Sequence, residues 1–248
     1  LIWLLGCAGC PGSNSGPATY PETNIEGTNV VLLMIDTLRH DRMGTYGYTA
    51  DTTPHLDQLA NKGVVFENWF STASWTRPGM ASIVTGQYPG AVGVYEEKFD
   101  RLPDDAVLLS ERLNDAGYVT MGVNSNPNLN DAFGFNQGFD AHLDAGVVWN
   151  WMKKEGMDGQ KFRKSSNNLD NAALVVDRGL SAIDQHVLGG TVPFYLQMVF
   201  IDPHWPYVPP EEHEQAVTQA GSDFPGYDGG IRFADFEIQR LLDGLNAR

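Results

Sequence analysis

Three mainly apolar runs are spread along the chain and separated by longer mixed stretches. They cover residues 29–35, 118–123 and 194–201, and each is followed directly by polar residues. Runs of this length suit strands that are buried on both faces of a parallel sheet, because no position in them needs to face water. A shorter apolar stretch at residues 64–66 predicts a further strand.

Apolar residues in the mixed stretches recur at the three- and four-residue spacing of helices that bury one face. The spacing predicts helices over residues 54–62, 78–85, 107–116, 168–187 and 229–245. Strands that alternate with helices in this way are typical of an α/β fold. We therefore predict a three-layer α/β/α sandwich with a mostly parallel sheet, formed by one domain over residues 29–248.

Polar residues that can carry chemistry follow the three predicted strands. Asp36 follows the first run, Asn124 and Asn126 follow the second, and His204 comes shortly after the third. The carboxyl ends of parallel strands meet at one edge of a sheet, which is where α/β proteins bind ligands. We therefore expect these side chains to converge. The two amides would donate to a phosphate or sulfate oxygen, or would simply shape an Asn/Pro turn.

The stretch 74–89 presents a candidate nucleophile. Pro78 suits the first turn of a helix and Gly86 its end, so Thr76 is expected at the amino terminus of that helix. The orphan N–H groups and the helix dipole favour an anion there. A cation held by Asp36 would make the Thr76 hydroxyl a nucleophile. The alternative is that Thr76 only caps its helix.

Composition narrows the class of partner. The chain has 248 residues, of which 42% are hydrophobic, which is enough for one sizeable core. Its formal net charge of −15 and the lack of a basic run predict that it does not bind nucleic acid. Both cysteines, Cys7 and Cys10, lie near the start, so the domain has no cysteine for a nucleophile, metal cluster or disulfide framework.

Several of these stretches resemble, in order, the motifs of sulfatase-like hydrolases in the alkaline phosphatase superfamily. The resemblance covers about residues 28–248 and implies an alkaline-phosphatase-like fold, hydrolysis of a sulfate or phosphate ester, and a divalent metal ion, calcium or zinc. The stretches that carry it are Asp36 to Tyr48 for the opening motif, 53–60 with 63–66 for the next helix and strand, 85–89 for the end of the nucleophile motif, and 201–207 for the histidine motif.

Four positions depart from the sulfatase pattern. The family's Cys or Ser, which true sulfatases oxidise to formylglycine, falls on Thr76, and threonine cannot give that aldehyde. The family's motif arginine falls on Met80, and its second acid falls on Thr37. A lysine-bearing segment is replaced by residues 124–127. The spacing around Thr76 also resembles nucleotide pyrophosphatases/phosphodiesterases, which use an unmodified threonine as nucleophile.

The resemblance implies a role for each candidate residue. Thr76 would form a covalent intermediate, and His204 would stabilise the oxyanion or protonate the leaving group. The expected substrate is a small-molecule, polysaccharide or lipid ester. The remaining expected contacts are substrate binding by Asn124, Asn126 and Arg77, and metal binding by Asp36, Thr37 and Thr76.

Two other functions remain open on the same residues. A catalytically impaired envelope protein that binds an anionic ligand is favoured by Thr37, because a hydroxyl holds a cation less tightly than a second carboxylate. A phosphoryl-group transferase would use the same nucleophile. In the family, the next segment supplies further metal ligands, so we expect the chain to be a truncated fragment that is inactive by itself.

The first residues predict an anchor. Leu4-Leu5-Gly6-Cys7 is similar to a bacterial lipobox, with Cys7 as the lipidated residue; Cys10 is a second candidate, and a Cys7–Cys10 disulfide is the alternative. Residues 1–10 would be a partial lipoprotein signal, and 11–28 a flexible linker. This predicts a bacterial cell-envelope protein, either lipid-anchored or periplasmic/extracellular, that touches the membrane only through its lipid. Residues 147–166 predict a surface insertion.

Overall fold

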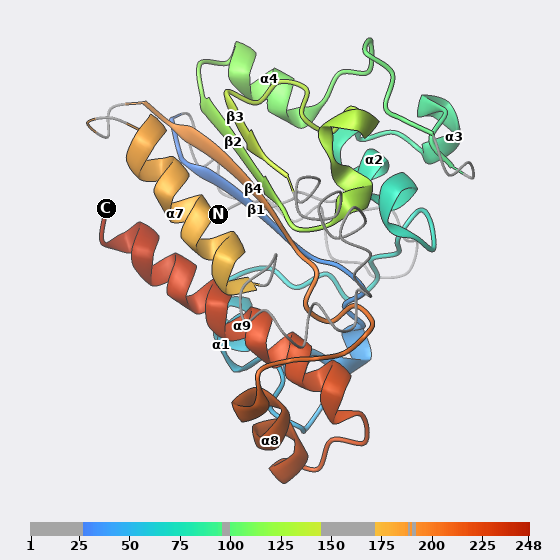
Figure 1. Ribbon diagram of the computed structural model, residues 1–248, viewed down its shortest axis with the longest axis vertical. Coiled ribbons are helices and arrows are strands. Elements are labelled where there is room, and N and C mark those ends of the chain that lie inside the picture. Colours follow the sequence, from blue (N-terminus) through green and yellow to red (C-terminus); the bar gives the residue numbers. More distant parts are fainter. Residues whose placement is uncertain (1–26, 96–99, 145–171, 188, 190–191) are drawn as a thin grey trace, which may run out of the picture.

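The computed structural model describes residues 27–95, 100–144, 172–187, 189 and 192–248. In that part of the chain, four strands form one sheet with the order β1-β4-β2-β3, and every pair is parallel (Figure 1). The predicted parallel sheet is confirmed. The strands are β1 (Val30–Ile35), β2 (Val119–Asn124), β3 (Ala141–Leu143) and β4 (Phe194–Phe200).

Successive side chains of β4 point into two different cores. Leu196 and Met198 join the core under α7 (Ala172–His186) and α9 (Pro225–Asn246), whereas Val199 joins the core on the opposite face. That second core is covered by α2 (Thr76–Thr85) and α4 (Leu109–Asp115) (Figure 1). Both faces are therefore buried, which explains why the strand is apolar throughout. The predicted α/β/α arrangement is confirmed.

Short elements connect these layers. The connecting helices α3 and α8, and the strand β3 of the sheet, were not predicted from the pattern, because β3 and α3 are very short and α8 is mostly polar. The connecting elements are α1 (Pro54–Ala60), α3 (Pro89–Val92), α8 (Glu211–Gln219) and the 3₁₀ turns His40–Arg42, Gly44–Tyr46, Pro127–Leu129 and Asp131–Phe133.

The strand predicted at residues 64–66 is wrong. The segment is an irregular loop in which Val64 is 57% exposed. None of the described strands pairs with it, so its backbone N–H and C=O groups join no ladder. A run of apolar residues therefore did not suffice to make a strand where no partner strand lies alongside.

Several predictions concern residues outside the described part. They are the lipidation of Cys7, the signal over residues 1–10, nearly all of the linker over 11–28, and the insertion at 147–166. These stay predictions. None of the helices that the structure describes is both long enough and apolar enough to cross a membrane.

A carboxylate from α9 closes the amino terminus of α1. Asp235 is fully buried, and its two oxygens accept hydrogen bonds from the backbone N–H groups of His55 at 3.0 Å and Leu56 at 2.8 Å. Both N–H groups lie in the first turn of α1, where a helix has no partner of its own for them. Burial raises the pKa of Asp235 to about 6. The carboxylate therefore joins two helices that are far apart in the sequence.

We predict that Asp235 makes stability fall as the pH rises from about 4 to about 6. Its pKa is raised from 3.8 to about 6 in the folded chain, so the folded state binds a proton that the unfolded state has released. This stabilising contribution is fully present below the pKa that Asp235 has in the unfolded state. It is lost as the pH rises through the pKa in the folded state, and it amounts to at most about 3 kcal/mol. Urea unfolding of the wild type and Asp235→Asn at about pH 4 and about pH 7 measures it.

The wild type should lose stability relative to the Asp235→Asn variant as the pH rises. The comparison cancels the titration of all other groups, because both proteins share them. A stability difference that stays constant within about 0.5 kcal/mol between the two pH values would contradict the prediction.

Candidate active site

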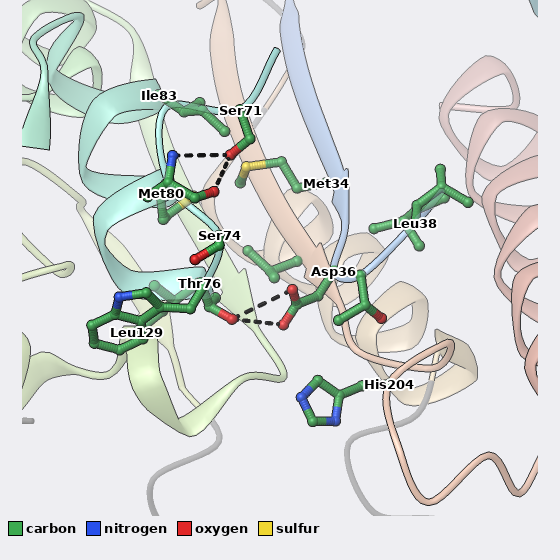
Figure 2. A pocket seen from close by; sticks show the side chains of 16 residues that line it. Met34, Asp36, Leu38, Ser71, Ser74, Thr76, Met80, Ile83, Leu129 and His204 are labelled. Atoms are coloured by element: carbon green, nitrogen blue, oxygen red, sulfur yellow. Dashed lines mark hydrogen bonds between the residues drawn. The ribbon is translucent and has the colours of Figure 1, made fainter. Parts of the chain in front are cut away.

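Two strand ends and one helix start meet at the carboxyl edge of the sheet. Asp36 directly follows β1, and its backbone N–H donates to the carbonyl of Phe200 at 2.8 Å, which extends the pairing of β1 with β4. Thr76 is the first residue of α2, and His204 lies shortly after β4. Asp36, Thr76 and His204 line one cavity of about 480 Å³ (Figure 2). Three of the predicted site residues are therefore brought together.

The Thr76 hydroxyl points at the Asp36 carboxylate (Figure 2). Its Oγ1 donates to Asp36 and lies 3.1 Å from Oδ2 and 3.4 Å from Oδ1. The residue at the cap position of α2 is Trp75, and no side chain caps this helix. Thr76 thus occupies the first helical position with its hydroxyl directed away from the helix, so the geometry does not support the interpretation of Thr76 as a cap.

Asn126 bonds the same oxygen of the Asp36 carboxylate as Thr76. Its Nδ2 donates to Asp36 Oδ2 at 2.5 Å and lies 3.5 Å from Thr76 Oγ1. Its Oδ1 accepts from the backbone N–H of Asn128 at 2.9 Å, which determines that the amide nitrogen faces Asp36. Asn126 therefore orients the carboxylate and places an N–H donor beside the hydroxyl.

His204 is half-buried and lines the same cavity as Asp36. Its Nδ1 lies 2.8 Å from the backbone carbonyl of Trp205. A carbonyl only accepts, so Nδ1 carries a proton and Nε2 is the nitrogen that takes up or releases one. The hydrogen bond to the Trp205 carbonyl therefore assigns the Nδ1–H tautomer to the neutral ring.

The structure does not place Asn124 as a substrate ligand. The residue is 3% exposed, and its amide nitrogen donates to the carbonyls of Asn126 at 2.9 Å and Leu129 at 2.8 Å. Its Oδ1 accepts from the backbone N–H of Asn126 at 2.8 Å. These bonds use the whole amide to shape the turn after β2, which supports the turn interpretation of this residue.

Arg77 also differs from its expected role, and the reason is burial. It is 2% exposed, and its guanidinium carbon lies 3.4 Å from the centre of the Phe133 ring. The guanidinium donates to the carbonyls of Asn128 at 3.2 Å and Asp100 at 3.1 Å, and burial lowers the pKa of Arg77. The expectation that Arg77 binds substrate is corrected: it braces α2 from behind.

The donor set at Asp36 fits part of a cation site. One carboxylate and the Thr76 hydroxyl face each other, and Thr37 lines the same cavity with a hydroxyl where the family resemblance places a second acid. Oxygen donors suit a hard cation such as Ca²⁺, and a carboxylate with a nearby imidazole also suits Zn²⁺. The three residues expected to hold a metal are thus compatible with one.

A second group of metal-type ligands lies at the end of β3. Asp131, His142 and Asp144 place ligand atoms within 4.8 Å of one another, the only such group of three or more in the described part of the chain. His142 Nδ1 lies 2.7 Å from Asp131 Oδ1, and Asp144 accepts from the Asp131 N–H at 3.0 Å. With strands about 4.8 Å apart, this end of the sheet is about 14 Å from Asp36. The group is therefore separate from the Asp36 site.

Three further residues of the cavity wall had no predicted role. Ser71, Ser74 and Trp75 belong to the loop before α2 and line the cavity. Figure 2 shows Ser71 and Ser74 beside α2. Met80, where the resemblance places an arginine, also lies in the wall. The far wall is mainly apolar and includes Met34, Ile83, Leu129 and Val199.

Comparisons with known proteins show the family and the fold of the chain. The Sulfatase family model matches residues 28–248. Arylsulfatase A from Bos taurus is 38% identical over 97 residues, a match that covers 37% of this chain and 19% of that protein. The match thus spans about a fifth of that relative's length.

Solved structures show the same fold. The crystal structure of Ps i-CgsB in complex with k-i-k-neocarrahexaose superposes with a TM-score of 0.68 and 19% identity over 88% of this chain and 55% of that chain. The C-terminal periplasmic domain of EcEptC from Escherichia coli, in complex with Zn, gives a TM-score of 0.64 and 16% identity over 90% and 60%. The chain therefore spans somewhat more than half of each of these structures.

We predict that Arg77→Ala lowers the free energy of unfolding by about 2–4 kcal/mol, because it removes a buried stacked cation and leaves two carbonyls without donors. Urea unfolding measures the change. Arg101 is the matched control: its side chain is 53% exposed and pairs with Asp104, so Arg101→Ala should cost less than about 1 kcal/mol. Equal losses for the two variants would contradict the bracing role.

Proposed function

Since the chain belongs to the sulfatase family, we propose that the natural protein hydrolyses a sulfate or phosphate ester through a covalent intermediate on Thr76. The observation that carries the proposal is the Asp36–Thr76 pair. A hydroxyl at the first position of a helix lies 3.1 Å from a carboxylate and opens into a cavity. This is the arrangement that a nucleophile needs: a partner that accepts its hydrogen bond, and a helix terminus that favours the substrate anion.

In the first step, Thr76 Oγ1 forms a bond to the phosphorus or sulfur while the bond to the leaving-group oxygen breaks. Asp36 orients the hydroxyl and takes up its proton as the new bond forms, while the Asn126 amide, 3.5 Å from Thr76 Oγ1, holds the carboxylate in place. His204 in its protonated form gives the Nε2 proton to the leaving alcohol. A divalent cation, calcium or zinc, held by Asp36, Thr37 and Thr76 would lower the hydroxyl pKa and offset charge in the transition state.

In the second step, water attacks the same phosphorus or sulfur and the bond to Thr76 breaks. Neutral His204 accepts one proton of that water, and Asp36 returns the proton that it took in the first step to Thr76 Oγ1. Sulfate or phosphate leaves, and the site returns to its starting state. An acceptor alcohol in place of water would make the same two steps a phosphoryl transfer.

The nucleophile favours a phosphate ester over a sulfate ester as the preferred substrate. An unmodified threonine has no aldehyde hydrate, which is the group that formylglycine sulfatases use. Binding of an anionic ligand without turnover is the second candidate function, and Thr37 is the observation that favours it, because it replaces a carboxylate by a hydroxyl. The two candidates share the site and differ only in turnover.

The alcohol part of the ester would be a small molecule, a polysaccharide or a lipid. Trp75, 36% exposed on the cavity wall, would stack on a sugar ring or an apolar group. The oligosaccharide bound by Ps i-CgsB supports a polysaccharide ester. We also propose a location in the bacterial cell envelope, with Cys7 lipidated. The similarity to the periplasmic domain of EcEptC supports the envelope location.

Thr76→Ala in the complete natural protein should lower turnover by about three orders of magnitude or more, because only binding and electrostatic contributions remain. Thr76→Ser should keep part of the activity. Turnover of aryl phosphate, phosphodiester and aryl sulfate substrates in metal-supplemented buffer measures this. Removal of the metal with a chelator should have an effect in the same direction.

Ser82→Ala is the control, because Ser82 lies in the same helix and is not among the residues lining the cavity. Its turnover should stay within about twofold of the wild type. Mass spectrometry of enzyme trapped with substrate should find the phosphoryl or sulfuryl group on Thr76. Wild-type turnover by Thr76→Ala, or a trapped group on another residue, would refute the mechanism.

A further inference from the structure

The first turn of α9 reaches the loop that carries Asp36. The Tyr227 hydroxyl donates to the carbonyl of Thr37 at 2.6 Å and accepts from the backbone N–H of Arg39 at 3.0 Å. The residue is 5% exposed, so water competes little for these bonds. Burial raises the pKa of Tyr227, so the hydroxyl keeps the proton that it donates to the Thr37 carbonyl. One side chain thus holds the backbone on both sides of residue 38.

The held segment contains a backbone conformation that needs support. Thr37 has a φ of 59°, in the left-handed region that side-chain-bearing residues seldom adopt. Such a residue costs about 1 kcal/mol or more and persists only where its surroundings impose it. Thr37 directly follows Asp36, so its conformation sets the direction in which the chain leaves β1. The Tyr227 hydroxyl bonds the Thr37 carbonyl itself.

The same turn of α9 also packs against the loop that carries His204. The Tyr227 ring lies edge-on to Tyr207, with ring centres 5.8 Å apart. The backbone N–H of Tyr207 donates to the His204 carbonyl at 3.3 Å. A Cβ on Gly230 would lie 2.7 Å from the carbonyl oxygen of Asp202, so only glycine permits this close approach. Tyr227 therefore stands between the two loops of the site.

We propose that Tyr227 is a positioning residue that sets the Asp36–Thr76 pair by holding residues 37–39. Its ring is fixed against the His204 loop and its hydroxyl is bonded to the Asp36 loop, so it ties the two strand ends into one arrangement. The structural part of this proposal stands on the hydrogen bonds alone. Its effect on turnover rests on the proposed function.

Tyr227→Phe removes the hydroxyl and keeps the ring, so the fold is retained. Tyr48→Phe is the matched control: the Tyr48 hydroxyl lies 2.5 Å from Asp228 Oδ2 and 2.7 Å from Arg42 Nη1, in the same corner of the molecule, but it has no bond to residues 37–39. Each variant loses two hydrogen bonds, those of the buried Tyr227 in one case and those of the half-buried Tyr48 in the other. Thermal unfolding of both establishes that their stability losses are comparable.

The first readout is amide hydrogen exchange, measured by NMR on the complete natural protein. The Arg39 N–H loses its acceptor in Tyr227→Phe, so its exchange should quicken about tenfold or more relative to Tyr48→Phe. This readout requires no activity, so it separates the structural proposal from the proposed function. Equal Arg39 exchange in the two variants would overturn the proposal, whatever happens to turnover.

The second readout is kinetic. Tyr227→Phe should lower kcat by about 10- to 100-fold with KM changed by less than about threefold, because the bound ester is attacked from a misplaced hydroxyl. Tyr48→Phe should keep kcat within about threefold of the wild type. Faster Arg39 exchange with an unchanged kcat would also overturn the positioning role. If Thr76→Ala keeps full activity, the proposed function fails and the exchange result still decides the structural part.

Discussion

The parallel pairing of β1 with β4 is the constraint on which the site depends. It brings the residues after both strands to the same edge of the sheet, and the bond from the Asp36 N–H to the Phe200 carbonyl continues the ladder up to the carboxylate itself. Without this pairing, Asp36 and His204 would have no reason to lie near each other. The two cores that cover the sheet supply the burial that makes the pairing stable.

Around that edge, groups of different origin restrict the Asp36–Thr76 pair. Asn126 bonds the carboxylate from the turn after β2, and Arg77 anchors the start of α2 through buried bonds to loop carbonyls. Tyr227 bonds the backbone just after Asp36. Preorganised groups of this kind lower the cost of reaching a reactive geometry. The support is placed behind and beside the cavity, which leaves the hydroxyl open toward a substrate.

Buried polar groups with hydrogen-bond partners carry much of this support. Asp228 is fully buried and accepts from Tyr48, Ser222 and Arg42, which joins the loop after β1 to the first turn of α9. A carboxylate without such donors would be costly at this depth. These bonds hold the first turn of α9 against residues 42–48, whereas the bonds to residues 37–39 come from Tyr227.

The sequence by itself determined the strands β1, β2 and β4, their parallel arrangement and the residues that follow them, because burial leaves a local pattern of apolar runs and because strand ends place the next residue at a known edge. Asp36, Thr76 and His204 followed from that pattern and from the family motifs. Only the tertiary structure decided that residues 64–66 form no strand, that Arg77 is a brace, that Asn124 shapes a turn, and that Tyr227 holds Thr37. For Arg77 and Tyr227 the deciding partners include backbone groups distant in the sequence, and the spacing of residues along the chain carries no record of them. For Asn124 the partners are nearby backbone groups that only the folded turn brings into hydrogen-bond distance.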